Sequence, residues 1–516
     1  MFGTSDKPLS VMLLTVLLTL GVFFRLSHLD HKVYWHDEAQ TSLHISGYRL
    51  PVARQPAEAG PVPIGTLDKF QHLNPQGTVF DVVQTLYAAN PHQPPLYFVL
   101  AHFWARWCGD SVAAVRALSA VLSILTIPVI WWLARELFPC HTTPWFAVAL
   151  AAVSPLHVLY AQEARTYSLW MLAIVVSSAT LLYALRHQTS AAWSAYAVSL
   201  AFGLNTHLLF VLVAVGHAIY VFAARQDSST ATQHRAFMRA TLAGTLAFLP
   251  WLAMLALRWH VAAAKMDWAM EPPADHGWWR QVVLNLSLIG IDAHTRTETP
   301  LLWLSGGMLV LITAALHSVI RETPRRTWTF ILCLGTPTLL ALGAPDLLIG
   351  GRRLATARYL IPCLLAIQLA LADVLARKTS GPAGSARAGW RALTVLLLIV
   401  ASASCASSWV ARTWWHLNLG RDNLEVAQIL QQAPRPLVAS ELYGSLLSLE
   451  HVASPDIAVL LLPWGTLDRV PPGFSDVFVL QPSVPLRDAL EHRHWRLEPI
   501  GETSLWRLTS FEPDAH

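Results

Sequence analysis

Long apolar runs alternate with short polar stretches along most of the chain. Eleven of these runs have about the length that a helix needs to cross a bilayer, roughly 17–25 residues. They occupy residues 9–26, 112–134, 143–161, 166–185, 191–207, 208–224, 237–257, 300–320, 327–345, 355–376 and 391–411. The pattern therefore predicts an α-helical polytopic membrane protein with about eleven transmembrane helices.

Residues 27–111, between the first and second runs, form a different kind of segment. They are polar and proline-rich up to about residue 93, and the apolar run that follows, PPLYFVLAHFWARW at 94–107, is short and interrupted. Apolar runs of about 10–14 residues are typical of interfacial or re-entrant segments. We therefore expect residues 27–111 to be a first outer loop that contains helices lying along the membrane surface.

Lysine and arginine residues indicate the orientation of the helices, because cytoplasmic loops are enriched in them. With the N-terminus inside and residues 94–107 on the surface, the inner ends and loops carry thirteen basic residues and only four acidic ones. If residues 94–107 crossed the membrane, every later loop would invert and the basic loop at 321–326 would face outward. The charge pattern thus favours the surface-lying interpretation and places the residues from about 412 onward outside.

The last hundred residues read as a small folded domain. Short apolar runs alternate with amphipathic ones there, which predicts an α/β arrangement. The expected elements are helices at 423–432, 441–451 and 485–492, strands at 436–440, 457–462 and 476–481, and a closing hairpin. We therefore divide the chain into a transmembrane domain, residues 1–411, and a small extracytoplasmic α/β domain, residues 412–516.

The composition agrees with a membrane protein and excludes several other classes. Of the 516 residues, 54% are hydrophobic and 13% are charged, whereas soluble proteins carry about 25% charged residues. The net charge of +4 is not gathered in a basic stripe, so we predict no nucleic-acid partner. The five cysteines form no CxxC pair and no trio of metal ligands stands out, so we predict no metal and no other cofactor.

Ionisable residues gather where the predicted topology places the outer ends of the helices. Five segments contribute: WHDEAQ (35–40), HQPPLYF (92–98), QEARTY (162–167), NTH (205–207) and RRLATARY (352–359). Arginine presents a fork of donors that matches phosphate oxygens, and a carboxylate can take the proton from an attacking hydroxyl. The combination indicates transfer of a group, such as a sugar, from a lipid-borne phosphate to a hydroxyl.

Each of these segments also has a purely structural interpretation. The alternatives are a solvated helix start for Asp37–Glu38, a helix-end ion pair for Glu163–Arg165, a snorkelling Arg358, a packed loop His207 and a surface Arg353. The functional hypothesis depends on convergence, because the structural interpretations would have to hold independently on five segments. We interpret Glu136, His157 and Asp373 as structural residues.

The order of the motifs resembles that of a known class of enzymes. W-x-D-E-A after the first apolar run, H-x-P-P-L-Y-F, Q-E-A-R-x-Y-S-L, N-x-H and R-Y-L-I-P follow one another between residues 9 and 376. This is similar to the bacterial polytopic glycosyltransferases of the GT-C class, in the branch related to protein O-mannosyltransferases and aminoarabinose transferases. The resemblance implies a polyprenyl-phosphate sugar donor and catalysis on the periplasmic side of the inner membrane.

The resemblance also implies roles for individual residues. Asp37 matches the leading catalytic carboxylate, with Glu38 as its neighbour. The expected donor-phosphate ligands are Arg165, Arg358 and Arg353. The residues expected to line the site are Glu163, Tyr167, His207, Tyr359, Pro94, Pro95 and Tyr97. Two departures, Gln40 where the aminoarabinose transferases have arginine and Leu208 where relatives often have an aromatic residue, leave the sugar and the acceptor open.

The leading hypothesis is thus a hexosyl- or pentosyltransferase that acts on a glycan, lipid or protein acceptor. A flippase or transporter of lipid-linked sugars is the first alternative, and it predicts ionisable residues deep in the spans or at their inner ends. A non-catalytic subunit of an envelope polysaccharide system is the second, and it predicts that substitutions in the five segments are silent. For residues 412–516 we hypothesise acceptor capture, so that their deletion would spare donor hydrolysis and abolish transfer.

Overall fold

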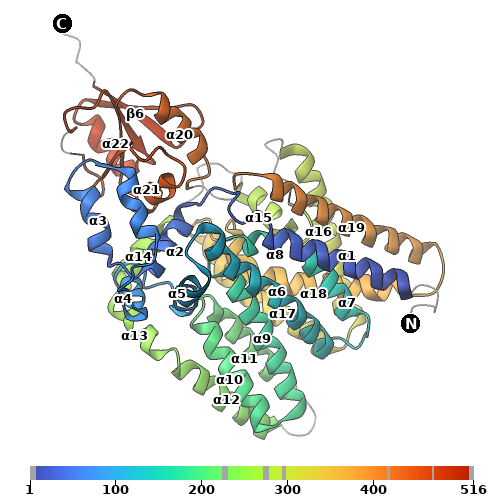
Figure 1. Ribbon diagram of the computed structural model, residues 1–516. Coiled ribbons are helices and arrows are strands. Elements are labelled where there is room, and N and C mark those ends of the chain that lie inside the picture. Colours follow the sequence, from blue (N-terminus) through green and yellow to red (C-terminus); the bar gives the residue numbers. More distant parts are fainter. Residues whose placement is uncertain are drawn as a thin grey trace. The chain divides into compact units, whose positions relative to one another are not determined.

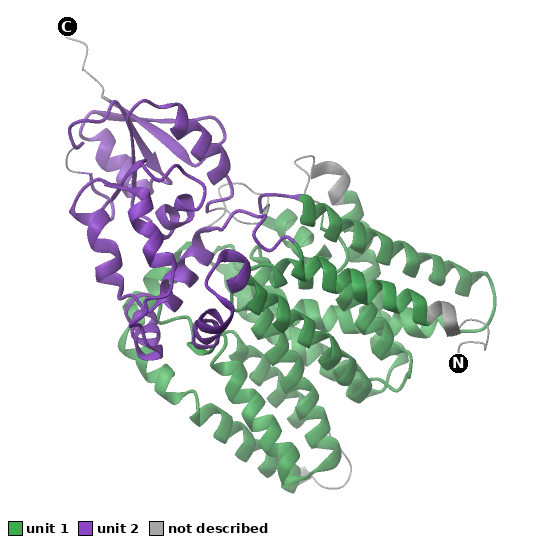
Figure 2. Cartoon of the chain, viewed as in Figure 1, with its two compact units in different colours: residues 1–27, 90–97, 116–410 green, residues 28–89, 98–115, 411–516 purple. Residues whose placement is uncertain are grey.

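The computed structural model describes residues 7–223, 230–270, 278–292, 298–414, 419–467 and 470–510. The elements are mostly helices, and they are labelled in chain order in Figure 1. The chain separates into two compact units, shown in Figure 2. Unit 1 comprises residues 1–27, 90–97 and 116–410, and unit 2 comprises residues 28–89, 98–115 and 411–516.

Unit 1 is built from apolar helices. In chain order these are α1 (Lys7–Leu26), most of α6 (Val112–Leu137), α7 (Thr143–Val153), α8 (Pro155–Ala161), α9 (Tyr167–His187), α10 (Ser190–Leu204), α11 (Phe210–Ala223), α12 (Thr230–Leu246), α13 (Leu249–Leu257), α14 (Trp259–Met266), α15 (Trp278–Ser287), α16 (Glu298–Glu322), α17 (Arg325–Leu348), α18 (Ile361–Thr379) and α19 (Ser385–Val410), with the 3-10 turns η2 (Asp267–Ala269) and η3 (Ala357–Leu360).

Each of the eleven predicted runs coincides with one helix or with a bent pair of helices. Six helices in the described residues are long and apolar enough to cross a bilayer. The number rises to eight if α7 with α8 and α12 with α13, each pair bent by 51°, count as single spans. The remaining runs are the shorter helices α1, α10 and α11. The helical polytopic architecture is confirmed, and the number eleven is not.

The middle of unit 1 is formed by α9 and α18, whose apolar segments are 78% and 89% buried. Helix α18 begins with Pro362 in its first turn and ends with Arg377 and Lys378. A proline is tolerated in a first turn because its missing N–H has no partner there, and basic residues favour the negative end of the helix dipole. These two helices therefore form a rigid centre around which the other spans pack.

Polar contacts between helices lock α1 into this bundle. The buried Arg25 donates to the Ser123 hydroxyl at 2.9 Å, to the carbonyl of Ala152 at 2.6 Å and to that of Ala151 at 2.7 Å. Gly21 permits the close approach, because a Cβ atom at this position would lie 2.4 Å from the Ala152 oxygen. The C-terminal end of α1, from which the first outer loop departs, is thereby fixed against α6 and α7.

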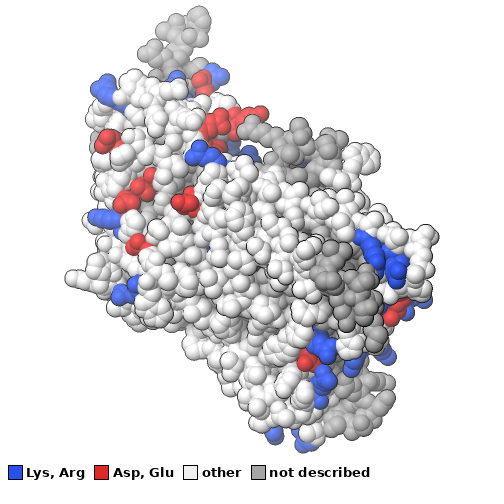
Figure 3. Space-filling view, turned by 45° about the vertical axis from the view of Figure 1, so that its right-hand side comes forward, with Lys and Arg blue, Asp and Glu red and all other residues white. Residues whose placement is uncertain are grey.

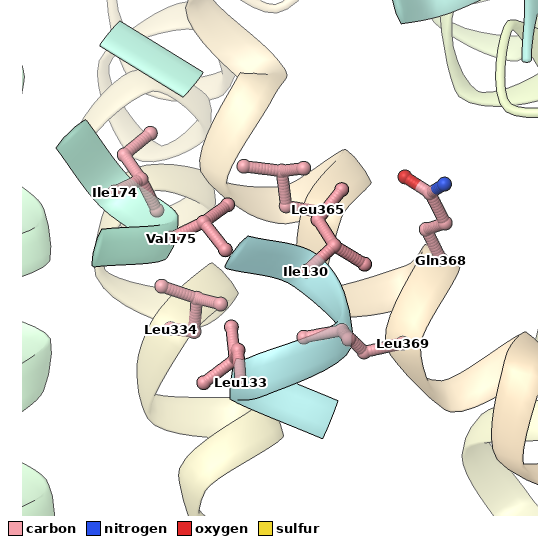
Figure 4. Close-up of a pocket in the computed structure, with 8 residues that line it drawn as sticks. All are labelled: Ile130, Leu133, Ile174, Val175, Leu334, Leu365, Gln368 and Leu369. Carbon is pink, nitrogen blue, oxygen red and sulfur yellow. The ribbon is translucent and has the colours of Figure 1, made fainter. Parts of the chain in front are cut away.

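The residues that we interpreted as structural all have structural partners. His157 Nε2 donates to the Gln368 side-chain oxygen at 2.9 Å, and Asp373 accepts from Arg377 at 2.7 Å. Glu136, at the end of α6, lies 3.4 Å from Arg186 at the end of α9. Figure 4 shows a small cavity beside Gln368, at the meeting of α6, α9, α17 and α18. The other lining residues are apolar, so this cavity contains no acidic, basic or nucleophilic side chain.

The outer surface of the helices in unit 1 is suited to lipid. Many large apolar side chains on it are exposed, including Val198, Leu257, Val310 and Leu340. Figure 3 shows that lysine, arginine, aspartate and glutamate leave broad areas of the visible surface uncoloured. A contiguous apolar surface of this kind marks a region covered by a membrane or a partner, which agrees with the predicted multi-pass topology.

Unit 2 combines the first outer loop with the C-terminal segment. Its elements are α2 (His36–Ser46), α3 (Leu50–Ala59), β1 (Val62–Pro63), η1 (Ile64–Gln71), α4 (Val79–Ala89), most of α5 (Leu96–Cys108), α20 (Asn423–Gln432), β2 (Pro436–Ser440), α21 (Tyr443–Glu450), β3 (Ala458–Leu461), β4 (Asp476–Leu480), α22 (Val484–Glu491), β5 (Trp495–Pro499) and β6 (Leu505–Ser510). The strand order in the sheet is β1-β3-β2-β4-β6-β5.

The predicted α/β character of the C-terminal segment is confirmed. Strand β2 pairs in parallel with β3 and β4, and β6 pairs antiparallel with β4 and β5. One feature was not predicted: the two-residue strand β1 from the first outer loop pairs with β3, with Val62 opposite Val459. The structure thus groups the outer loop with the C-terminal segment, whereas the predicted boundary at residue 411 assigned that loop to the transmembrane domain.

The outer loop contains the expected helices α3, α4 and α5. Each of them exposes large apolar side chains, such as Val52, Phe80 and Trp107. Exposed apolar faces on short helices are typical of segments that lie in a membrane interface. That these helices lie along the membrane surface stays a prediction.

Candidate functional site

The QEARTY segment forms the bend between α8 and α9. Glu163 and Arg165 are buried there, and the Arg165 backbone N–H donates to the Glu163 carbonyl at 2.7 Å. The Gln162 side chain donates to the Phe24 carbonyl at 2.7 Å, at the end of α1. The bend is therefore held in one conformation from both sides, with a carboxylate and a guanidinium two residues apart.

The HQPPLYF segment is attached to the same part of unit 1. The backbone N–H of Leu96 donates to the Asn205 carbonyl at 3.1 Å. The Tyr97 hydroxyl lies 3.1 Å from that of Ser119, which in turn donates to the Arg165 carbonyl at 3.4 Å. Pro94 is buried and Pro95 is half-buried in this connection. The structure thus brings Pro94, Pro95 and Tyr97 beside the QEARTY bend and the NTH turn.

His207, in the turn between α10 and α11, stacks on an aromatic side chain of α9. Its ring lies parallel to that of Trp170, with 4.0 Å between the ring centres. The Leu209 N–H donates to His207 Nδ1 at 3.2 Å, so the proton of the neutral ring is on Nε2. Arg165, His92 and Arg358 act electrostatically on His207. His207 is therefore a hydrogen-bonding group set among cationic side chains.

Arg358, in η3, lies among three aromatic rings. Its guanidinium carbon is 5.9 Å from the ring centre of Tyr167, 5.6 Å from that of Trp268 and 5.7 Å from that of Tyr359. A cation over aromatic faces gains about 0.5–2 kcal/mol and is held in orientation. Trp268, in η2, was not predicted as a site residue, because nothing in its local sequence distinguishes it from an interfacial tryptophan.

Arg352 and Arg353, which precede Arg358 in the sequence, have partners in their own loop or in η2. Arg352 donates from Nε to the Trp268 carbonyl at 2.9 Å and lies over the ring of Trp268. Arg353 forms an ion pair of 2.6 Å with the buried carboxylate of Asp346, which also accepts from the Leu354 N–H. Arg353 therefore stabilises its own loop, and its predicted contact with a donor phosphate stays a prediction.

A buried acid that the sequence did not reveal belongs to the same neighbourhood. Asp292 is 3% exposed, and the loop before it is docked by a hydrogen bond of 2.9 Å from the Leu156 N–H to the Leu288 carbonyl. Tyr160 interacts electrostatically with Asp292 and also with Glu163 and Arg358. The sequence feature that could have indicated Asp292 is its position as a single aspartate directly after the apolar sequence LSLIGI.

The predicted catalytic acids belong to unit 2. Asp37 and Glu38 lie in the first turn of α2, which follows the extended residue Trp35. Glu38 is completely buried, whereas Asp37 is partly exposed. Of the two carboxylates, Asp37 is thus the one that a substrate can reach. The other four predicted segments lie together in unit 1.

No group of three or more histidine, cysteine, aspartate or glutamate residues in the described part of the chain could hold a metal ion. The expectation that the protein uses no metal and no other cofactor stays a prediction.

Comparisons with known proteins relate this arrangement to membrane glycosyltransferases. Residues 92–254 match the dolichyl-phosphate-mannose-protein mannosyltransferase family. No curated protein matches the chain. The apo oligosaccharyltransferase of Archaeoglobus fulgidus has 13% identity and a TM-score of 0.51, over 89% of this chain and 65% of that chain. Apo ArnT of Cupriavidus metallidurans has 13% identity and a TM-score of 0.51, over 98% of both chains.

The structural similarity and the sequence match support different conclusions. The structural likeness, at 13% identity, establishes the fold, and this chain spans 65% of the length of the archaeal oligosaccharyltransferase. The family match is a likeness of sequence, and it includes the HQPPLYF, QEARTY and NTH segments. The predicted resemblance is thereby confirmed: the chain has the fold of the polytopic GT-C glycosyltransferases, and residues 92–254 carry the sequence pattern of the dolichyl-phosphate-mannose-protein mannosyltransferases.

Proposed function

We propose that the protein is a glycosyltransferase of the bacterial inner membrane, which transfers a hexosyl or pentosyl group from a polyprenyl phosphate to an acceptor hydroxyl on the periplasmic side. The observation that carries the proposal is the meeting of four motif segments in unit 1, where Arg165 and Arg358 act electrostatically on His207, and Glu163 and Arg358 act on Tyr160. The family matched by residues 92–254 takes its sugar from dolichyl phosphate, as its name states.

In the proposed reaction the acceptor oxygen attacks the anomeric carbon of the donor sugar. The bond between that carbon and the phosphate oxygen breaks, and the electron pair leaves with the polyprenyl phosphate. The guanidinium groups of Arg165 and Arg358 offset the charge that develops on the phosphate, an effect that is strong in a water-poor site. Asp37 takes the proton of the acceptor hydroxyl as general base. A single displacement of this kind inverts the configuration at the anomeric carbon.

The flippase alternative is less well supported by the buried charges of unit 1. A flippase needs ionisable groups that face a pathway through the membrane. Arg25, which is buried at the C-terminal end of α1, donates to helix carbonyls and to Ser123. Asp373 is likewise held by Arg377 and by Thr143. These charges bind helices together. Asp373 and Arg377 lie toward the C-terminal end of α18, whereas the site charges lie at the N-terminal ends of α9 and α18.

A donor panel tests the proposed function. We expect the purified protein in lipid to release free carrier from one of several radiolabelled polyprenyl-phosphate sugars. The rate should rise when native membranes supply the acceptor, because hydrolysis by water is slower than transfer to a bound hydroxyl. If no sugar is consumed by the purified protein or by native membranes that contain it, the proposed function is wrong.

Asp292 gives a further prediction within unit 1. We expect Asp292→Asn to lower kcat about 10-fold to 100-fold, because losing one charge from a buried network costs about 2–5 kcal/mol of interaction and shifts the groups around it. Steady-state kinetics with the donor identified above would measure the change. Asp267→Asn is the matched control, because Asp267 is an exposed acid in η2, next to Trp268. Equal kcat values for Asp292→Asn and Asp267→Asn would show that Asp292 does not contribute to the site.

A further inference from the structure

Helix α2, which carries Asp37, packs directly on helix α21 of the C-terminal segment. The contact is closest at Gly444, the second residue of α21. A Cβ atom at this position would lie 2.8 Å from Cε1 of His36 and 2.9 Å from both Cγ and Nε2 of Gln40. An alanine at this position would therefore displace the side chains of His36 and Gln40, because real Cβ atoms essentially never come within 3.0 Å of such neighbours.

A chain of three hydrogen bonds joins the same two helices. The Ser445 hydroxyl donates to the Gln481 side-chain oxygen at 2.6 Å. Its oxygen is then free to accept from His36 Nδ1, which is 2.9 Å away. His36 Nε2 accepts from the Gln40 side-chain amide at 2.9 Å. In this series of hydrogen bonds each donor meets an acceptor when His36 is neutral with its proton on Nδ1. The series connects the start of α2 to the residue that follows strand β4 of the C-terminal sheet.

The residues just before α2 are bound to the C-terminal segment as well. The Val33 N–H donates to the Arg412 carbonyl at 2.9 Å, and the Val33 carbonyl accepts from the Trp414 indole at 3.0 Å. The Ser448 hydroxyl, on α21, donates to the Tyr34 carbonyl at 2.6 Å. The backbone just before α2 is therefore bound by residues that lie 381 and 414 positions away at Trp414 and Ser448.

A third attachment reaches the middle of α2. The Gln71 amide donates to the Ala39 carbonyl at 3.2 Å, and its oxygen lies 3.3 Å from Nε2 of His451, which directly follows α21. The start of α2 and the residues before it are thus bound directly by the C-terminal segment, and the body of α2 is bound through Gln71 of η1, which contacts His451. Gln40, the position that departs from the aminoarabinose transferases, belongs to this attachment through its bond to His36.

From these contacts we infer that the C-terminal segment positions the catalytic acid: α21, through Gly444, Ser445 and Ser448, holds the helix that presents Asp37. This inference rests on the proposed function, because it requires Asp37 to be the general base. It replaces the acceptor-capture hypothesis for residues 412–516. Acceptor capture predicts that donor hydrolysis survives loss of the segment, whereas positioning predicts that transfer and hydrolysis fall together.

The test uses the full-length protein with single substitutions in α21. We expect Gly444→Ala and Ser445→Ala each to lower kcat about 10-fold to 100-fold, since a misplacement of about 1 Å at a reacting group costs up to about 10²-fold. The KM for the donor should stay within about twofold, because neither residue belongs to the arginine cluster of unit 1. Donor hydrolysis without acceptor should fall by the same factor as transfer.

Ser483→Ala is the matched control in the same segment. Ser483 caps α22 by accepting from the Leu486 N–H at 3.2 Å, and its hydroxyl donates to the Glu441 carboxylate at 3.0 Å. Losing such a cap costs about 1 kcal/mol, so this variant destabilises the C-terminal segment without touching α2. We expect its kcat to equal that of the wild type. A kcat for Gly444→Ala and Ser445→Ala that matches this control would overturn the inference.

Hydrogen exchange provides a readout that does not depend on activity. The amides of α2 should exchange faster in Gly444→Ala than in Ser483→Ala if α21 supports this helix, and equal exchange rates would count against the inference. The two proposals can fail separately. An inactive Asp37→Asn beside a fully active Gly444→Ala contradicts positioning alone. A wild type that consumes no donor contradicts the proposed function, and the exchange rates of α2 still decide whether α21 holds it.

Discussion

Asp37→Asn is expected to lower the rate of sugar transfer by about 10²–10⁴-fold, the range that a general base contributes. Asparagine keeps the size of the side chain and a carbonyl oxygen, so the first turn of α2 should retain its structure. It cannot accept a proton from the acceptor hydroxyl, so the attack must proceed from a neutral nucleophile. The KM for the donor should change little, because the arginines of unit 1 are intact. Release of labelled carrier and formation of labelled product would measure the effect.

Two controls make this prediction specific. Asp30→Asn removes an exposed carboxylate seven residues earlier and should leave kcat unchanged. Glu38→Gln tests the neighbouring acid, which is completely buried. Its effect should appear as a lower thermal midpoint, because a completely buried carboxylate that loses its charge loses interactions with the protein around it. Transfer at the wild-type rate by Asp37→Asn would show that the base is another group.

Local patterns explain why much of the fold could be predicted from sequence. The bounds of α20 and β2 agree with those expected, because ten and five residues of clear periodicity carry their own signal. The apolar runs became helices because a chain that enters a bilayer must satisfy its backbone hydrogen bonds internally. Neither inference needed a contact between distant residues.

The features that could not be predicted all depend on distant contacts. Strand β1 has two residues, too few for any periodicity, and it exists because Val459 lies opposite Val62. Trp268 joins the site only because η3 folds back on η2, and Gly444 matters only because α2 packs on it. A single sequence contains no signal for such pairs. The predicted division at residue 411 differs from the bounds of unit 2 for the same reason.

Arg352, Arg353 and Arg358 show how far similar residues diverge once the chain is folded. In the sequence all three are arginines at the start of a span. In the structure Arg353 is neutralised by Asp346, and Arg352 donates to the backbone of η2. Arg358 is instead oriented by three aromatic rings and acts electrostatically on His207 and Tyr160. Because it lies among these rings and acts on His207, Arg358 is a stronger candidate for a phosphate ligand than Arg352 or Arg353.

Arg358→Ala is accordingly expected to lower kcat/KM for the donor by about 10²–10³-fold. A charge-assisted pair with a phosphate, removed in a water-poor site, costs about 2.7–4 kcal/mol, as the loss of an oxyanion donor does in other enzymes. Arg358→Lys should recover part of the loss, because lysine supplies the charge without the fork of donors. The experiment compares donor turnover by the two variants over a range of donor concentrations.

The matched control for this prediction is an arginine at the other end of α9. Arg186 is exposed and pairs with Glu136 at 3.4 Å, and surface pairs of this kind contribute about 0–1 kcal/mol. Arg186→Ala should therefore keep kcat/KM within about twofold. The two variants should also differ in how kcat/KM depends on salt. Screening at 0.15 M acts over about 8 Å, so a charge near the phosphate and a charge far from it respond differently. If Arg358→Ala and Arg186→Ala turned over the donor equally well, the donor phosphate would have to be bound by Arg165 and residues outside η3.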